Sequence, residues 1–264
     1  MPCSRFPIVA ALIASWLAGE ARFGQRAFGE TVYLTPSADT SLLENFPDHN
    51  FGGQTYFNSG TTQNYTKNRG LLRFDLPGQV PTGATINSVT LTLEVVGQPS
   101  EPGTPSNFGL HRMQVGWGEG DKSGQPPQLG ASATTGEANW TDRFAFQSEW
   151  GVSGGQAGVD FNTLPSGESY VYGVNFSPYL FDTTPDLVGD LQSWLDHPES
   201  NFGWMLLSQS EDQNFTARRF ASREDPFSPP QLAIDFTPVP EPSVWALGLA
   251  ACATVWLFRG QRGR

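Results

Sequence analysis

The sequence predicts an all-β protein, an antiparallel sandwich or barrel that carries one short helix. Short runs rich in β-branched and aromatic residues alternate with clusters of Gly, Pro, Asn and Ser through the middle of the chain. Residues 89–95 alternate apolar and polar side chains strictly, as a half-buried strand does. A single segment, residues 184–195, has helical spacing of its apolar residues instead.

The N-terminal segment, residues 1–29, has the features of a cleavable export signal. Arg5 precedes an apolar run over residues 8–17, which has the length of a signal-peptide core and is too short to span a bilayer comfortably. Small residues suit cleavage by signal peptidase after Ala21 or after Gly29, and the sequence leaves both open. We therefore expect an exported protein whose folded domain begins near residue 30.

Nine strands are expected in the folded domain. Val89, Leu91 and Leu93 share one face of the fourth of them, and threonines alternate with them on the other face. The predicted ranges are 31–35, 54–58, 70–76, 86–96, 108–115, 170–176, 203–208, 216–221 and 231–236.

Residues 184–195 are expected to form the helix. Thr184 can cap its N-terminus, and Pro185 suits the first turn. Apolar residues recur at helical spacing from Leu187 to Leu195, so one face of the helix should pack on the sandwich.

The C-terminal segment, residues 238–264, has the features of a membrane-anchored sorting signal. A Pro-Glu-Pro motif precedes an uncharged apolar stretch over residues 244–258, which we expect to form a short transmembrane helix. Three arginines follow it and place the C-terminus on the cytoplasmic side. The residues of the motif and of the cluster are Pro240, Glu241, Pro242, Arg259, Arg262 and Arg264.

This order of motif, apolar helix and arginine cluster resembles the PEP-CTERM sorting signal of Gram-negative bacteria. The resemblance implies an exosortase as processing partner, which cuts near the Pro-Glu-Pro motif. It also implies anchoring in the inner membrane before processing, and then delivery to the cell surface or the extracellular matrix. An ordinary tail anchor is the alternative.

Charge and cysteine content narrow the classes of partner. The chain has 26 acidic and 15 basic residues, and setting aside two acidic and six basic residues in the processing segments leaves 24 and 9. A surface this acidic repels nucleic acid, which we exclude as a partner. Cys3 and Cys252 both lie in the processing segments, so the folded domain has no disulfide.

Short motifs are spread over residues 30–237. They are ADT at 38–40, NFGG at 50–53, RGLLRFDL at 69–76, PTGATI at 81–86, WGEG at 117–120, GEANW at 136–140, NFGW at 201–204 and FASRE at 220–224. Together they resemble the DNRLRE, or disaggregatase-related, domain. The resemblance implies a jelly-roll-like sandwich on secreted or surface proteins, with carbohydrate binding in some relatives, and it transfers no catalytic residues to this chain.

A long connecting region, residues 117–162, is rich in Gly and poor in strand signal. Such a segment packs on itself or has a functional role, and we expect the functional surface there. Trp117, Trp140 and Trp150 are the candidate carbohydrate-binding residues, because their ring faces could stack on sugars. The alternative is that these side chains fill a small core beneath the loops.

The sequence gives no local support for hydrolytic chemistry. His49, His111 and His197 are scattered, and no His-x-x-x-His motif is present to hold zinc. Carboxylates such as Glu119 and Glu137 could pair in space as in a glycosidase, but solvated surface charge explains them in so acidic a chain. We therefore expect no enzyme; a polysaccharide hydrolase or lyase is the less favoured alternative.

Calcium is the cofactor that the sequence suggests. Asp39, Asn45, Asp48 and Asp235 offer the oxygen ligands that calcium takes, although no loop has EF-hand spacing. The predicted function is an exported surface or matrix protein that binds polysaccharide, and the alternative is a structural matrix protein without a ligand. Exposed, clustered aromatic residues would favour binding, whereas burial of the three tryptophans would favour the structural role.

Overall fold

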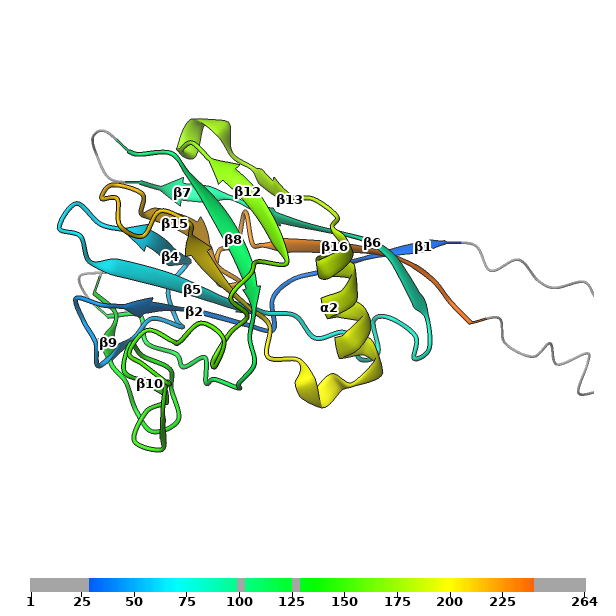
Figure 1. Ribbon diagram of the computed structural model, residues 1–264, viewed down its shortest axis with the longest axis horizontal. Helices are drawn as coiled ribbons and strands as arrows, with labels where there is room; N and C mark the ends of the chain where they lie inside the picture. The colour runs from blue at the N-terminus through cyan, green and yellow to red at the C-terminus, as the bar shows by residue number, and fades with distance from the viewer. Residues whose placement is uncertain (1–28, 99–102, 125–128, 240–264) are drawn as a thin grey trace, which may run out of the picture. The chain divides into compact units, whose positions relative to one another are not determined.

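Two antiparallel sheets face each other in the computed structural model, which describes residues 29–98, 103–124 and 129–239 (Figure 1). This arrangement, with one α-helix among the described residues, confirms the expected all-β sandwich; the finer jelly-roll-like assignment stays a prediction. The predicted signal peptide and sorting tail lie outside the described residues, apart from their innermost positions. Within the described part, no helix is long and apolar enough to cross a membrane.

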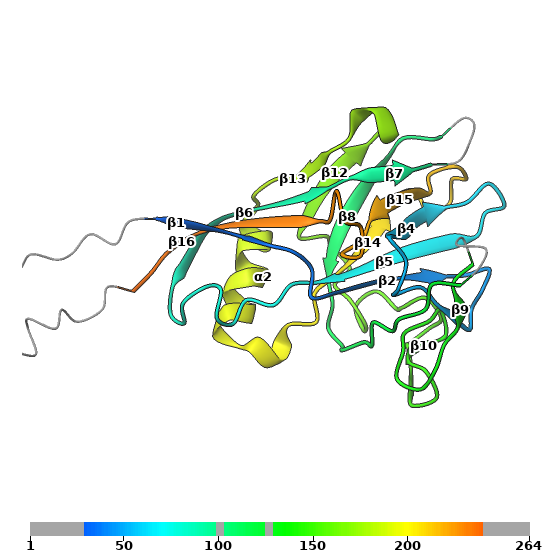
Figure 2. The ribbon, with the colours of Figure 1, turned by 180° about the vertical axis from the view of Figure 1, so that it is seen from behind.

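The small sheet has four strands in the order β1-β16-β6-β13. Because β1 pairs with β16 along the whole length of β1, the chain enters and leaves the sandwich at the same end (Figures 1 and 2). The strands are β1 (Glu30–Leu34), β16 (Gln231–Thr237), β6 (Thr85–Leu93) and β13 (Tyr179–Phe181).

The large sheet has eight strands. Seven of them lie in the order β12-β8-β14-β5-β4-β15-β7, and the eighth, β2, pairs with β5 outside this order. The sheet forks at β4, whose first four residues pair with β15 and whose last two, Gly60 and Thr61, pair with β5. The strands are β12 (Gly167–Val171), β8 (Ser106–Arg112), β14 (Trp204–Ser208), β5 (Lys67–Arg73), β4 (Tyr56–Thr61), β15 (Arg218–Ala221), β7 (Val95–Gly97) and β2 (Ala38–Leu43).

The first hydrophobic core lies between the sheets. Val89, Leu91 and Leu93 of β6 are buried in it, as their alternation predicted, and Phe108 and Phe220 pack edge to face from the large sheet. The predicted helix is confirmed as α2 (Pro185–Asp196), which the 3-10 helix η2 (Pro198–Ser200) follows.

Helix α2 begins where its sequence predicts. Thr184 is the N-cap, and its Oγ1 accepts a hydrogen bond from the backbone N–H of Leu187 at 3.0 Å. The apolar stripe then packs on the first core, where the ring of Trp194 lies 4.6 Å from that of Trp204 between centroids. Both the N-cap and the packing of the apolar face therefore stabilise α2.

The outer face of the large sheet carries a second hydrophobic core. Residues 113–124 and 129–162, named here the capping region, fold over this face with almost no regular structure. Their short strands are β9 (Ala131–Ser132), which pairs with β3 (His49–Asn50), and β10 (Asp142–Phe144), which pairs with β11 (Ser148–Glu149). The region packs on itself and on the sheet, one of the two outcomes expected for a long Gly-rich connection.

Buried polar side chains join the capping region to the strands. Asn50 is fully buried and its amide nitrogen donates to the carbonyl oxygens of Glu119 and Ala138, at 2.6 and 2.9 Å. Arg69 of β5 donates to the carbonyl oxygens of Gly154 and Gly155, at 2.8 and 2.9 Å. These bonds satisfy backbone groups that no sheet ladder serves.

Each predicted strand range overlaps an observed strand, but β2 and β13 of the two main sheets and the short strands β3, β9, β10 and β11 were not predicted. All six residues of β2 are buried. Ala38 and Leu42 face the second core, while Ser41 and Asp39 accept hydrogen bonds from the backbone N–H groups of Asn58 and Arg223, so no alternation appears in its sequence. The predicted strand over residues 170–176 ends at Val171, and the 3-10 helix η1 (Val174–Phe176) follows.

Candidate functional site

The three tryptophans proposed to bind carbohydrate lie in the second core. Trp117, Trp140 and Trp150 are 3%, 7% and 4% exposed, and the indole N–H of Trp150 donates to the Asn139 carbonyl at 2.9 Å. Their ring faces contact protein and offer no platform to a sugar. The alternative expected for them, a core beneath the loops, is what the structure shows, because the Gly-rich backbone folds tightly around large rings.

The four residues proposed for calcium do not converge. Asp39 is buried in β2 and its Oδ2 accepts from the backbone N–H of Arg223 at 2.7 Å, whereas Asp235 lies on the small sheet and accepts from the hydroxyl groups of Thr31 and Ser88. Asn45 and Asp48 are exposed. In the residues that the structure describes, no group of three or more His, Cys, Asp or Glu could hold a metal ion.

Glu119 and Glu137 each have a basic partner. Glu119 accepts two bonds from Arg223, at 2.5 and 3.1 Å, and one from the backbone N–H of Asp39. Glu137 accepts from Lys122 Nζ at 2.7 Å. Burial raises the pKa of Glu119 from its ordinary value of 4.5, although the hydrogen bonds of Asp39 and Arg223 oppose this shift. Both carboxylates hold the capping region in place.

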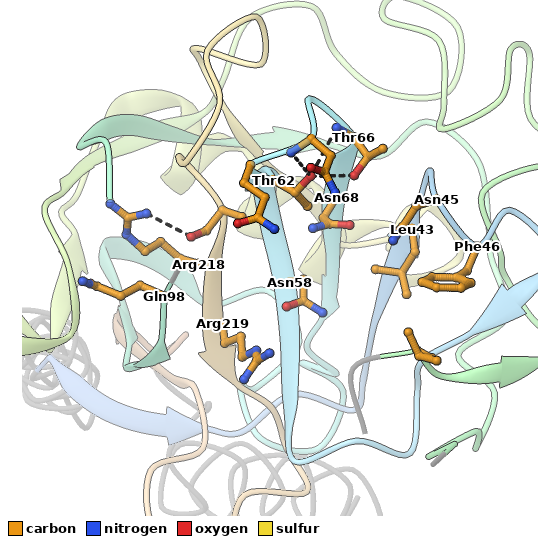
Figure 3. A pocket seen from close by; sticks show the side chains of 14 residues that line it. Leu43, Asn45, Phe46, Asn58, Thr62, Thr66, Asn68, Gln98, Arg218 and Arg219 are labelled. Atoms are coloured by element: carbon orange, nitrogen blue, oxygen red, sulfur yellow. Dashed lines mark hydrogen bonds between the residues drawn. The ribbon is translucent and has the colours of Figure 1, made fainter. Parts of the chain in front are cut away.

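A pocket of about 300 Å³ opens where β4 leaves β5 to pair with β15 (Figure 3). The loops after β2 and β4 and the end of β7 contribute to its walls. The turn between β4 and β5, which contributes to its lining, lies at the end of the sandwich opposite the outer ends of β1 and β16 (Figures 1 and 2). Its lining residues are Leu43, Asn45, Phe46, Asn58, Thr62, Gln63, Asn64, Thr66, Asn68, Gln98, Leu129, Ala217, Arg218 and Arg219.

Side-chain amides dominate this pocket. Those of Asn45, Asn58 and Asn68 make no hydrogen bond to any residue in the described part of the chain, and Figure 3 shows Asn58 and Asn68 side by side on the central strands. Each amide offers two donors and one acceptor oxygen. Unpartnered amides in a concave site can bind the hydroxyl groups of a ligand without losing bonds within the protein.

The pocket is the exception to the acidity of the chain. Two arginines line it, and no Asp or Glu is among the described lining residues. Arg219 packs its guanidinium 4.9 Å from the centre of the Tyr56 ring and makes no hydrogen bond or ion pair with another described residue. Its donors are therefore available to an acceptor in the pocket, and they favour a ligand with negative charge.

Arg218 has a different role in the same wall. It is 1% exposed, and its guanidinium donates to five backbone carbonyl oxygens. Among these are the carbonyls of Thr104 at 2.9 Å and Tyr172 at 2.8 Å. Burial lowers the pKa of Arg218. This side chain holds three loops together at the closed side of the pocket.

The turn between β4 and β5 supplies the rim. Thr62 Oγ1 bonds Thr66 Oγ1 at 2.6 Å and accepts from the N–H groups of Asn64 and Thr66. Tyr65 at its tip has a φ of 61° and is 63% exposed. A non-glycine residue in the left-handed region is uncommon and marks a turn that its surroundings hold in shape.

Comparison with known families points to the same part of the chain. Residues 30–144 match the family model of carbohydrate-binding module family 96. This span runs from β1 to β10 and includes all pocket residues except Ala217, Arg218 and Arg219. A search of curated proteins found no match.

Sequence reasoning missed the pocket. Its asparagines are spaced over residues 45–68 and become neighbours only because β2, β4 and β5 meet at the fork. A usable signal did exist, since residues 58–68 hold three Asn and one Gln in eleven positions with no acid. In a chain this acidic, that local composition could have indicated a site.

Proposed function

We propose that this protein binds polysaccharide in the asparagine-lined pocket at the fork of β4 and β5. The observation that carries the proposal is the set of unpartnered asparagines at the fork, within the span that matches carbohydrate-binding module family 96. Amide groups beside an arginine and the ring of Phe46 suit sugar hydroxyls and ring C–H groups. Arg219 and the lack of carboxylates in the described lining lead us to expect acidic sugars to bind more tightly than neutral ones.

The proposed activity is binding without catalysis. The carboxylates considered for a glycosidase site, Glu119 and Glu137, lie in the capping region and are paired with Arg223 and Lys122. Neither is part of the pocket lining. A sugar held in the pocket would therefore meet donors and acceptors but no carboxylate pair.

We further propose export, and sorting by an exosortase at the C-terminal Pro-Glu-Pro motif. The sequence features of residues 1–29 and 238–264 support this. Because β1 and β16 end together, a tether at either end would leave the sandwich far from the pocket (Figure 1). Expression with and without an exosortase, followed by mass spectrometry of the C-terminus, tests it: an intact tail in both hosts would reduce this segment to an ordinary anchor.

The binding proposal is tested by calorimetry of the purified full chain with acidic and neutral polysaccharides, each with calcium and with chelator. We expect saturable binding that Asn58→Ala weakens by about tenfold, the loss of one or two good hydrogen bonds. Asn87→Ala is the matched control, because Asn87 lies on the small sheet and bonds Thr237. Equal binding by both variants would place the site elsewhere.

A further inference from the structure

Three aromatic side chains, one in β12 and two in the segment that follows it, form an exposed row, named here the aromatic strip. Tyr170 and Tyr172 are 52% and 53% exposed, and Phe176 of η1 is 67% exposed. Their rings are in contact, with centroids 5.0 Å apart from Tyr170 to Tyr172 and 5.4 Å apart from Tyr172 to Phe176. Contiguous exposed aromatics on a soluble domain mark an interaction surface.

Buried groups hold the backbone that carries the aromatic strip. The hydroxyl of buried Tyr179 accepts from the N–H groups of Tyr172 and Gly173, at 3.1 and 2.7 Å, and donates to the Gly173 carbonyl at 2.6 Å. A Cβ on Gly173 would lie 2.2 Å from Gln98 Oε1, so the segment is closely packed. The rings are thus exposed on a pre-organised support, which lowers the entropy cost of binding.

The aromatic strip is joined to the pocket by two hydrogen bonds. Gln98, which lines the pocket, accepts from the backbone N–H of Val174 at 2.9 Å, and Arg218 donates to the carbonyl of Tyr172 at 2.8 Å. Figure 3 shows Gln98 and Arg218 close together on one side of the pocket. A ligand that leaves the pocket past Gln98 meets η1 and then the rings.

We propose that the aromatic strip is an extension of the pocket that stacks on successive sugars of the same polysaccharide chain. The inference rests on the proposed function, since it assumes that the pocket holds sugar. Tyrosine rings with polar tips stack on C–H faces while their hydroxyls bond to water or sugar. Asn107 lies directly opposite Tyr170 in the β-ladder and adds an amide beside the rings. We therefore expect longer sugar chains to bind more tightly than short ones.

A second copy of this chain is the competing occupant, because β12 is an edge strand of the large sheet. The hydrogen bonds of Gln98 and Arg218 favour the sugar chain, since they join the backbone of the aromatic strip to the wall of the pocket proposed to hold sugar. Light scattering of the purified full chain separates the two: a dimer that Tyr172→Ala converts to monomer would overturn the proposal.

The main test is calorimetry of the full chain with polygalacturonate, with xylan, and with oligomers of each from the dimer to the octamer. We expect the octamer of the preferred series to bind at least tenfold more tightly than the dimer. Tyr172→Ala should lower the affinity for the octamer about tenfold and leave the affinity for the dimer unchanged. This is the effect expected from the loss of one stacked ring at a binding surface. Tyr33→Ala is the control, because Tyr33 is 63% exposed on β1, an edge strand of the small sheet.

The two proposals fail in different ways. If Asn58→Ala weakens dimer and octamer alike while Tyr172→Ala binds both as the unaltered chain does, the pocket stands and the extension falls. If neither polysaccharide nor any oligomer binds, both fall. A loss of octamer affinity in Tyr172→Ala but not in Tyr33→Ala supports the extension.

Discussion

The domain has two groups of large aromatic residues on one sheet, and the two groups differ in solvent exposure. The tryptophans of the capping region are buried under Gly-rich loops on the outer face of the large sheet, whereas Tyr170, Tyr172 and Phe176 lie exposed at its edge. The position of the first group in a long loop made its members candidates for sugar binding, with a core beneath the loops as the alternative. The comparison teaches that loop length and aromatic content do not indicate exposure, because a loop long enough to fold back makes its own core.

Exposed, clustered aromatic residues are the feature that the sequence analysis expects of a binding protein. The exposed group has this feature, although its residues are not the tryptophans that were the candidates. Clustered exposed aromatics were expected of a binding module and buried tryptophans of a structural one, and the structure has both features. The tryptophans of the capping region are core residues, and the binding surface is proposed for the pocket and the strip beside it. Substitutions should separate the two groups by their effects on stability and on binding.

The largest expected effect is on the buried group. Trp150→Ala should lower the free energy of unfolding by about 3–5 kcal/mol, because it empties the second core and leaves the Asn139 carbonyl without its donor. Urea unfolding followed by circular dichroism measures it. A change below about 1 kcal/mol would mean that the capping region contributes little to the stability of the sandwich.

The next largest effect on stability is expected at Arg69, which joins the large sheet to the capping region. Arg69 forms two hydrogen bonds with the carboxylate of Glu211, at 2.8 and 2.7 Å, beside its bonds to Gly154 and Gly155. Arg69→Met should cost about 3 kcal/mol, because a largely buried carboxylate loses its partner. Limited proteolysis should then cut near residues 150–160. Arg69→Met with Glu211→Gln is the control and should recover part of the loss.

A smaller effect is expected from pH at Asp39. Burial raises its pKa well above 3.8, and the charges of Glu224 and Glu119 add to the shift, while the backbone N–H of Arg223 opposes it. Between the ordinary and the raised pKa the folded protein binds more protons than the unfolded chain, so this group lowers stability as pH rises through that window. Melting temperatures of Asp39→Asn and the unaltered chain, compared from about pH 4 to 7, should diverge with rising pH in favour of the variant. Parallel curves would contradict the assignment.

The smallest effect on stability is expected at the exposed group. Tyr170→Ala and Tyr172→Ala should change the free energy of unfolding by less than about 0.5 kcal/mol, as exposed side chains away from special contacts do. The same urea titration measures both. A loss as large as that of Trp150→Ala would show that these rings belong to the fold, and the contrast between the two groups would disappear.

Local sequence order was sufficient for the sandwich and its helix. Alternation over residues 89–95 predicted the buried face of β6, and the order Thr184, Pro185 followed by an apolar stripe predicted α2 to within a residue at each end. These features depend on interactions within a few positions of the chain, so they can be inferred from spacing. Strand β2 could not, because burial on both faces erases the period that identifies a strand.

The candidate site was decided by tertiary structure. Asn45, Asn58 and Asn68 have no special spacing and share a pocket only because β4 forks from β5, and Gln98 and Arg218 reach the same wall from distant parts of the sequence. Burial is likewise a property of the assembled chain. The sequence shows that a residue is aromatic, but what covers it depends on residues distant in the chain, as when the indole N–H of Trp117 donates to the Phe202 carbonyl. Composition and local period are encoded residue by residue, whereas exposure and convergence arise only when the sheets close.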